Sequence, residues 1–408
     1  MPMNQVTIDV RREPTDAFIA SVRKKYPVET EIDHILTRKM ANRHKAGYAA
    51  FSLEALRNGI EGLIRSEVGS SFALENVRWL PGGFSKIQVA FDLEWDGAAR
   101  KARQKTPMVL RMEPAEAIVQ TSRRREFEIL NLAKEVVPTA PVFWLDSDGR
   151  YLPYPALVYG FAPGVTLPSG AGAQHIKGGR TVFSPSLRSA LAPQFVAHLA
   201  AIHTIPAAKI AALKHFQAGK VGSNESVVRQ VNCWRRVWEE DRAEEVPLMN
   251  VVAQWLIDNA PPLDHPSVVH GDYRVGNFLF TEHDARITAW LDWELSVIGD
   301  RHQDIMWAAM HMMRRLAEDN HTELAGGLIA IDDLYERYEK ASGLTVDPKR
   351  LRYFRLFNDF QASVHMLGTA PRIASLGKTD KDVAVAWISM IGNVAVASLR
   401  DSLEEALQ

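Results

Sequence analysis

Three oxygen-bearing side chains between residues 267 and 307 have the types and spacing that phosphoryl transfer requires. Asp272 follows a short β-branched apolar run, Asn277 comes after four intervening residues, and Asp292 ends the second strand of a predicted hairpin. Phosphoryl transfer needs a carboxylate beside the attacking hydroxyl and oxygen ligands for the magnesium that bridges the nucleotide phosphates. An Asp, four residues and an Asn is the spacing of the kinase catalytic loop, and an Asp after the next hairpin is the usual second metal ligand. We therefore predict that the three side chains converge at one end of a two-stranded unit.

The sequence around these residues resembles the catalytic core of the aminoglycoside phosphotransferase-like small-molecule kinases, which share the protein-kinase fold. The resemblance rests on HGDYRVGN (270–277), LDWE (291–294) and GDRHQDIMW (299–307), and it is strongest to the kinase-like domains linked to acyl-CoA dehydrogenases. Where that family usually reads Gly-Asp-Pro, this chain has Arg301 in place of the proline. The resemblance implies two catalytic residues, Asp272 to orient the hydroxyl and His270 to brace the loop, and three metal ligands, Asn277, Asp292 and Glu294.

Composition and charge narrow the class of protein. The 408 residues are 46% hydrophobic and 24% charged, as in ordinary soluble globular proteins, and are enough for two lobes. Lys and Arg number 48 against 49 Asp and Glu, so no charge imbalance favours nucleic acid or an anionic membrane. The single cysteine, Cys233, rules out an intramolecular disulfide. Because neither a signal-peptide pattern nor an apolar run of about 18 residues is present, we expect a cytoplasmic protein without a membrane span. Either a monomer or a homodimer is expected.

A glycine-containing hairpin precedes the catalytic segment by about 190 residues. Alternating apolar residues predict strands on both sides of Pro81–Ser85, and glycines at the tip would let backbone N–H groups approach phosphate. By the resemblance, Gly82, Gly83 and Ser85 are expected to cover the nucleotide. The chain has no GxxxxGK[ST] sequence, so a P-loop fold is not expected.

The strand at 107–113 carries Arg111 where kinases usually place a phosphate-binding lysine. Arginine keeps the charge and can grip phosphate with two hydrogen bonds, and Lys86 is an alternative cation for this role. Helical periodicity over 122–136 turns Glu126 inward, which predicts an Arg111–Glu126 ion pair. The resemblance also makes 158–164 the linker between the lobes, in which the backbone of Tyr159, Gly160 and Phe161 would bind adenine.

Helical patterns cover most of the remaining chain. In the N-terminal extension, 1–68, we expect helices at 16–26 and 53–68; the extension could pack on the small lobe, form a dimer contact or shape the substrate cleft. In the large lobe we expect helices at 305–313, 329–338, 351–366 and 383–406. Four methionines between 305 and 313 could line an apolar acceptor pocket, with core packing the default. The acidic residues 239–241 are expected to be the solvated end of a helix.

These patterns predict a bilobal α+β fold of the protein-kinase type, with a small β-rich lobe at 69–157 and a large helical lobe at 165–408. The expected activity is ATP- and Mg²⁺-dependent transfer of the γ-phosphoryl group to a hydroxyl of a small molecule, for which we favour a hydroxyacyl or other apolar acceptor. An aminoglycoside- or macrolide-type antibiotic kinase is one alternative. A nucleotide-binding pseudokinase that acts as a scaffold is another, prompted by Arg111 and Arg301. A protein kinase is disfavoured because the Ala-Pro-Glu segment is missing.

Overall fold

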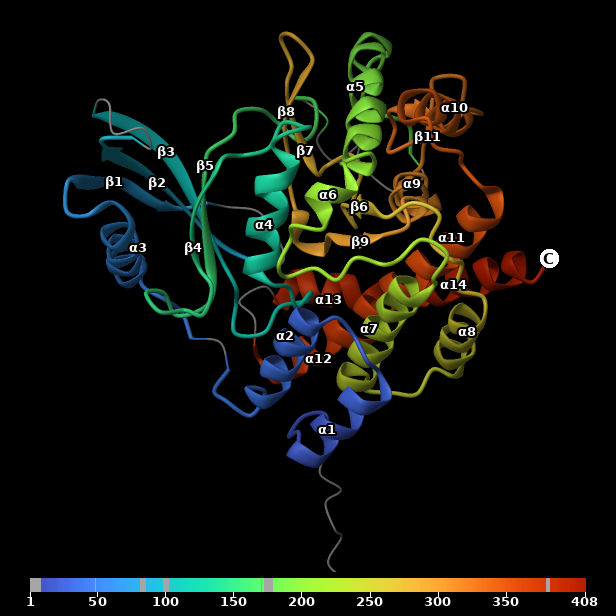
Figure 1. The fold of residues 1–408 in the computed structure, drawn as a ribbon, viewed down its shortest axis with the longest axis horizontal. Helices are drawn as coiled ribbons and strands as arrows, with labels where there is room; N and C mark the ends of the chain where they lie inside the picture. The colour runs from blue at the N-terminus through green and yellow to red at the C-terminus, as the bar shows by residue number, and fades with distance from the viewer. Residues whose placement is uncertain are drawn as a thin grey trace, which may run out of the picture.

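The chain folds into a small sheet-rich lobe and a large helical lobe, as predicted (Figure 1). The computed structural model describes residues 9–47, 49–80, 86–97, 103–169, 171, 179–378 and 382–408. The predicted bilobal α+β architecture is confirmed.

The small lobe is built on a five-stranded antiparallel sheet with the order β1-β2-β3-β5-β4. Its strands are β1 (Phe72–Trp79), β2 (Ile87–Trp95), β3 (Gln104–Met112), β4 (Val142–Asp146) and β5 (Ala156–Gly160). The alternating residues of β2 point to one face, where they meet the apolar side of helix α3 (Leu53–Val68). The Ser52 hydroxyl accepts from the Ala55 N–H at the start of α3, and Gly69 ends the helix. This helix of the extension is therefore part of the small-lobe core.

Helix α4 (Arg123–Ala133) packs beside β4 and β5, between the sheet and the large lobe (Figure 1). The Ser122 hydroxyl caps its first turn by accepting from the Arg125 N–H. Ile129 and Ala133 lie in the core that also contains the catalytic segment. Because Glu126 lies in the first turn of α4, this packing fixes its position relative to the catalytic segment.

The large lobe is mostly helical, with small strand pairs at its centre (Figure 1). Two short pairs, β6–β9 and β7–β8, carry the catalytic segment, and β10–β12 form a three-stranded sheet that the sequence analysis did not predict. The bounds of the main elements are α5 (Pro185–His203), α6 (Ala207–Ile210), α7 (Glu225–Asp241), α8 (Pro247–Asp258), β6 (Ser267–Val269), β7 (Phe278–Thr281), β8 (Arg286–Trp290), β9 (Val297–Gly299), α9 (His302–Ala308), β10 (Arg315–Leu316), β11 (Glu323–Ala325), β12 (Ile329–Ala330), α10 (Ile331–Ser342), α11 (Pro348–Ser363), α12 (Ala370–Leu376), α13 (Asp382–Met390) and α14 (Gly392–Ala406).

Several predicted helices have different bounds in the structure. The helix expected at 305–313 ends at Ala308, and a separate 3₁₀ turn follows at His311–Met313. The helix expected at 351–366 runs from Pro348 and continues as a π-helix over Val364–Thr369. The single helix expected at 383–406 is two helices that meet at Ile391. Met306 packs in the large-lobe core with α11, so core packing, rather than an acceptor pocket, describes this methionine.

The first two helices of the extension pack on the large lobe. Helix α1 (Asp16–Lys25) lies where it was expected, whereas α2 (Thr30–Ala41) was not predicted, and both contact α7. Lys39 of α2 reaches the end of α7, where its ammonium is 2.9 Å from Glu240 and 3.0 Å from Asp241.

These contacts correct the expectation of a solvated acidic helix end. The Glu240 and Asp241 carboxylates are buried. In addition to Lys39, Glu240 pairs with Arg236 at 2.8 Å, and Asp241 pairs with Arg43 at 2.7 Å. These two acids and three cations form a buried ion cluster that joins the extension to the large lobe. The physical reason is that the extension covers this end of α7 and supplies Lys39 and Arg43, while Arg236 lies on α7 itself.

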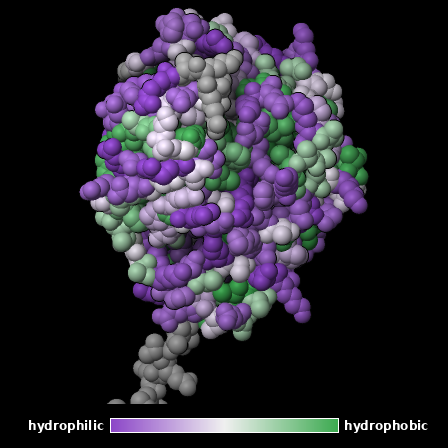
Figure 2. All heavy atoms as spheres, turned by 60° about the vertical axis from the view of Figure 1, so that its left-hand side comes forward, coloured by the Kyte–Doolittle hydropathy of each residue, from purple (hydrophilic) through white to green (hydrophobic). Residues whose placement is uncertain are grey.

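On the small-lobe side of the molecule, hydrophilic residues predominate and hydrophobic ones are scattered among them (Figure 2). Within the described ranges, none of the helices has both the length and the apolar composition needed to cross a bilayer.

Candidate active site

The catalytic loop begins where β6 ends, and a buried carboxylate holds its backbone. Asp304 in the first turn of α9 accepts hydrogen bonds from the N–H groups of His270 (2.6 Å) and Gly271 (2.8 Å). Gly271 has φ +83°, and a Cβ at this position would lie 2.5 Å from the Leu295 carbonyl oxygen. The turn therefore requires glycine. The sequence analysis did not single out Asp304, although an acid inside the apolar run Asp304–Trp307 could have indicated a buried role.

His270 links the catalytic loop to the strand that precedes Asp292. Its Nε2 donates to the Leu291 carbonyl oxygen at 2.9 Å, and its Nδ1 accepts from the Asp272 N–H at 3.3 Å. Burial lowers the pKa of His270, which keeps the ring neutral and suits one donor and one acceptor nitrogen. Both ring nitrogens thus bind the backbone, which makes His270 a positioning residue.

The Asp272 carboxylate is held by three donors. Oδ1 accepts from Trp307 Nε1 (2.6 Å) and from Arg274 Nε (2.8 Å), and Oδ2 accepts from Asn277 Nδ2 (2.5 Å). Burial raises the pKa of Asp272; Arg274 opposes this shift and the negative charge of Asp292 adds to it. The side chain keeps 18% of its exposure, so a substrate can reach it.

Asn277 and Asp292 lie at the same end of the β7–β8 hairpin. Phe278 pairs with Trp290 in the hairpin, and the Leu291 N–H donates to the Asn277 carbonyl oxygen at 2.8 Å. Asp292 adopts the left-handed conformation, with φ +56°, and its side chain is 42% exposed. The structure thus brings Asp272, Asn277 and Asp292 together as the spacing predicted.

Arg111 extends from β3 to three acids. Its guanidinium is 3.2 Å from Glu126, 3.1 Å from Glu294 and 2.6 Å from Asp292. The predicted Arg111–Glu126 ion pair is present. Arg111 also contacts Asp292, one of the two expected metal ligands at the hairpin end.

The acids beside Arg111 are shared with two further buried cations. Lys86 is 2.8 Å from Glu113 and 3.4 Å from Glu294, and Arg123 is 2.8 Å from Glu113 and 3.2 Å from Glu294. Arg123 also pairs with Glu126 one turn along α4. Lys86 is therefore held by acids, and the carboxylate of Glu294, expected to bind metal, faces cations. The roles of Glu113 and Arg123 were missed by the sequence analysis. Glu113 lies two strand positions after Arg111 and Arg123 three helix positions before Glu126, and each spacing places the two side chains on the same face.

The linker between the lobes follows β5. The Gly160 N–H donates to the Pro141 carbonyl oxygen at 2.7 Å, and the Phe161 N–H donates to the Pro107 carbonyl oxygen at 3.0 Å. The Tyr159 side chain is half-buried, and burial raises its pKa to about 12. Two of the backbone donors expected to bind adenine are thus bonded within the chain. The glycine loop residues Gly82, Gly83 and Ser85 lie outside the described residues, between β1 and β2.

Oxygen ligands at the hairpin end suit magnesium. The Asp292 carboxylate and the side-chain oxygen of Asn277 are hard donors of the kind that Mg²⁺ prefers. Among the described residues, no cluster of three or more His, Cys, Asp or Glu side chains is arranged to hold a metal ion. Two protein ligands fit Mg²⁺ in kinases, because nucleotide phosphates and water complete its coordination.

Comparison with known proteins defines the class to which this site belongs. Residues 92–352, more than half of the chain, match the profile of the phosphotransferase enzyme family (APH). The chain belongs to this family and is a kinase-type phosphotransferase that acts on hydroxyl groups.

Two similar sequences belong to longer proteins. Acyl-CoA dehydrogenase family member 10 of Mus musculus is 26% identical over 279 residues, which cover 65% of this chain and 24% of that protein. The probable acyl-CoA dehydrogenase IBR3 of Arabidopsis thaliana is 25% identical over 336 residues, 74% of this chain and 38% of that protein. The chain thus spans well under half the length of these relatives, and the predicted similarity to dehydrogenase-linked kinase-like domains is confirmed.

Two solved structures share the fold. A candidate aminoglycoside phosphotransferase from Ralstonia eutropha JMP134 aligns with a TM-score of 0.63 at 22% identity, covering 88% of this chain and 100% of that one. A macrolide 2'-phosphotransferase type I aligns with a TM-score of 0.51 at 18% identity, covering 83% of this chain and 97% of that one.

Proposed function

We propose that this protein transfers the γ-phosphoryl group of ATP, with Mg²⁺, to a hydroxyl of a small molecule, namely a hydroxyacyl compound or another acceptor with an apolar part. The observation that carries the proposal is the convergence of Asp272, Asn277 and Asp292 at one end of the β7–β8 hairpin. Family membership supports phosphotransfer to a hydroxyl, and the donor set supports ATP and Mg²⁺.

Asp272 orients the acceptor hydroxyl and takes its proton. Trp307, Arg274 and Asn277 fix the carboxylate, so the hydroxyl meets an oxygen that is already positioned. The transition state of phosphoryl transfer is loose, and positioning therefore contributes more than basicity. The raised pKa of Asp272 remains compatible with this role, because a carboxylate needs only to accept the proton late.

Asn277 and Asp292 would hold Mg²⁺, which would neutralise charge on the phosphates. Arg111 binds the non-transferred phosphates, and Glu126 and Glu294 fix its position. Gly82, Gly83 and Ser85, which lie outside the described residues, would cover the phosphates. The backbone at Tyr159–Phe161 would receive adenine through groups that are not already bonded to Pro107 and Pro141. The three cations around the Glu294 carboxylate favour an anchoring role over metal ligation for this residue.

A second candidate is a nucleotide-binding scaffold without turnover. The contact between Arg111 and Asp292 favours it, since this ion pair occupies a carboxylate needed for metal. Nucleotide binding without hydrolysis or transfer, unchanged in Asp272→Ala, would support the scaffold.

The test is transfer of ³²P from γ-labelled ATP to a panel of hydroxyacyl-CoAs, macrolides and aminoglycosides. We expect Mg²⁺-dependent labelling of a hydroxyacyl acceptor, reduced on the order of 100- to 1000-fold in Asp272→Ala. Asp284→Ala, which changes an exposed acid in the turn of the same hairpin, is the matched control and should keep full activity. Labelling of an aminoglycoside alone contradicts the proposed acceptor class, and equal activity of both variants contradicts the mechanism.

A further inference from the structure

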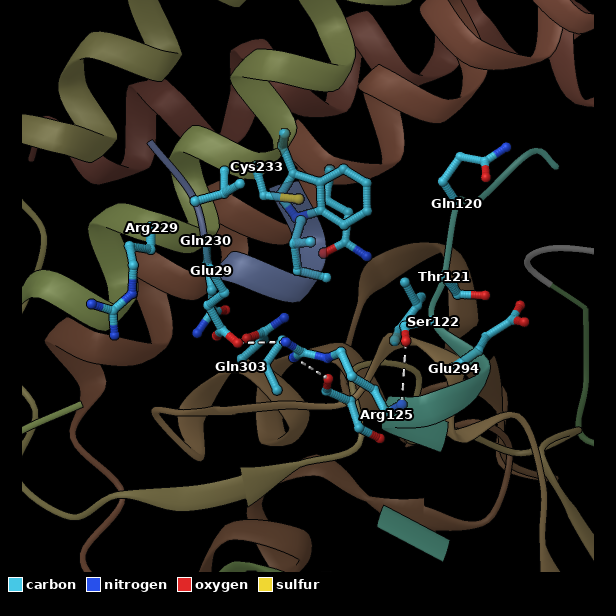
Figure 3. A pocket seen from close by; sticks show the side chains of 17 residues that line it. Glu29, Gln120, Thr121, Ser122, Arg125, Arg229, Gln230, Cys233, Glu294 and Gln303 are labelled. Carbon is cyan, nitrogen blue, oxygen red and sulfur yellow. Dashed lines mark hydrogen bonds and ion pairs between the residues drawn. The ribbon is translucent and has the colours of Figure 1, made fainter. Parts of the chain in front are cut away.

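A cavity of about 70 Å³ lies where the extension, the small lobe and the large lobe meet (Figure 3). Each of α2, α4, α7, α9 and α11 contributes to its wall, as does the segment that follows Asp292. At roughly 15 Å³ for each water-sized group, this volume holds a ligand segment of about five non-hydrogen atoms. The cavity is therefore the size of a short aliphatic chain.

Two side-chain amides of the wall carry buried acceptor atoms that need a donor. Gln303 and Gln361 are only 3% and 1% exposed. Within the described part of the chain, Oε1 of each has no hydrogen-bond partner. Unpartnered buried polar atoms are rare because they are costly, and amide oxygens only accept hydrogen bonds. The pair of oxygens therefore fits a ligand that brings hydrogen-bond donors.

The charged side chains of the wall are matched by partners on the chain. Arg125 pairs with Glu29, donates to the carbonyl oxygens of His215 (3.3 Å) and Ser296 (3.1 Å), and stacks over Phe216. Figure 3 shows Arg125 directed to Glu29. Glu294 meets the cations described above, and Arg229 pairs with Glu225.

The rest of the wall is largely apolar. Ile32, Trp234, Leu295 and Val297 supply apolar surface to the cavity. Because its charged groups are paired and two of its buried amide oxygens lack a donor, the cavity suits an uncharged segment that brings donors better than an ammonium or carboxylate group.

The cavity adjoins the catalytic residues. Gln303 lies one helical turn before Trp307 on α9, and Trp307 Nε1 donates to Asp272. Leu295 follows the metal ligand Asp292 by three residues. Asn358 Nδ2 donates to the Gln303 carbonyl oxygen at 3.1 Å and holds α11, which carries Gln361, against α9.

From these contacts we infer that the cavity binds an uncharged, hydroxylated aliphatic segment of the phosphoryl acceptor, whose hydroxyls donate to Gln303 Oε1 and Gln361 Oε1. This assignment rests on the proposed phosphotransfer at Asp272 and defines the part of the acceptor that the chain recognises.

Cys233 provides a direct reporter of cavity occupancy. It is the only cysteine of the chain and it lines the cavity. Because burial raises the pKa of the thiol to about 12, alkylation by N-ethylmaleimide is followed at about pH 9, where more thiolate forms than at neutral pH. The probes are butane-1,4-diol, the single-donor 1-butanol and the cationic 4-aminobutan-1-ol. We expect the diol to slow alkylation at a lower concentration than either comparison compound.

Two variants test the amide contacts. Gln303→Met and Gln361→Met should each raise the diol concentration for half-protection at least about fivefold, as the loss of one neutral hydrogen bond implies. Gln254→Met on the exposed face of α8 is the control and should leave it unchanged. The melting temperature of the two cavity variants should not fall, because each removes an unpartnered oxygen. A thermal shift with the same compounds provides a second readout.

Equal protection of the parent and both cavity variants, or no protection by the diol at 100 mM, overturns the inference. If an acceptor is phosphorylated with an unchanged KM in both variants, the cavity assignment fails while the proposed function stands. If the diol protects Cys233 through both glutamines but no acceptor is phosphorylated, the proposed function fails while the binding site stands.

Discussion

Replacement of Asp304 by asparagine should weaken both the fold and catalysis, because one buried carboxylate serves three donors. It accepts from the N–H groups of His270 (2.6 Å) and Gly271 (2.8 Å), and it contacts His203 Nε2 at 3.2 Å. Asparagine keeps the shape but turns one acceptor oxygen into an NH₂ donor, which then faces a backbone N–H. A hydrogen bond to a charged group contributes about 1.5–3 kcal/mol to stability. Asparagine loses one such bond and also places its NH₂ donor against a backbone N–H donor. Together these effects should lower the free energy of unfolding by about 2–4 kcal/mol.

The assay is urea unfolding of the parent, Asp304→Asn and the control Asp284→Asn, followed by tryptophan fluorescence. Asp284 is an exposed acid in the β7–β8 turn, and its replacement should leave the midpoint unchanged. Because Asp304 fixes the loop that carries Asp272, we also expect kcat to fall at least about tenfold at saturating ATP. An unfolding free energy within about 0.5 kcal/mol of the parent, together with unchanged kcat, would refute the assigned role of Asp304.

Three further predictions concern the loop glycine, two partly buried histidines and the arginine of β3. Gly271→Ala should lower the free energy of unfolding by about 1–3 kcal/mol and reduce kcat, because the alanine Cβ would lie 2.5 Å from the Leu295 carbonyl oxygen. A calorimetric stability equal to that of the parent contradicts this prediction. Burial lowers the pKa of both His198 and His365 to about 4, so each histidine favours the folded state fully above pH 6.5. The free energy of unfolding should decline by up to about 3 kcal/mol for each histidine as the pH falls towards 4. Urea midpoints that stay level over this range contradict this prediction. Arg111→Met should destabilise the fold by about 3–5 kcal/mol, because it removes a cation from buried acids; a loss below about 1 kcal/mol in urea unfolding would be inconsistent with the ion network.

The catalytic segment was predictable because its signals are local. The spacing of Asp272 and Asn277 and the hairpin before Asp292 lie within a few residues of each other, and strand pairing leaves little freedom in where they meet. The Arg111–Glu126 pair followed from strand and helix periodicity together with the resemblance. The start and end of α3 were readable from Ser52 and Gly69, since caps are also local.

Other features were not predictable because distant segments determine them. Glu240 looked like a solvated acid at a helix end, but α2 covers it and places Lys39 against it, in addition to its pairing with Arg236. Glu294 was expected at the metal, and its contacts with Arg111 and Arg123, which the 3₁₀ turn at Trp293–Leu295 allows, were not foreseen. Asp304 gave no spacing signal of its own, because its partners, the backbone of His270 and Gly271 and the side chain of His203, lie more than thirty positions earlier.

Binding of a divalent ion with nucleotide tests the central claim most directly. Mn²⁺ titrated by electron paramagnetic resonance in the presence of a non-hydrolysable ATP analogue reports the metal without requiring an acceptor. We predict at least one nucleotide-dependent Mn²⁺ site in the parent and in Asp284→Ala, and its loss or at least tenfold weakening in Asp292→Ala and Asn277→Ala. Mn²⁺ binding that is the same in all four proteins would contradict the assignment of this hairpin end as the metal and phosphoryl-transfer site.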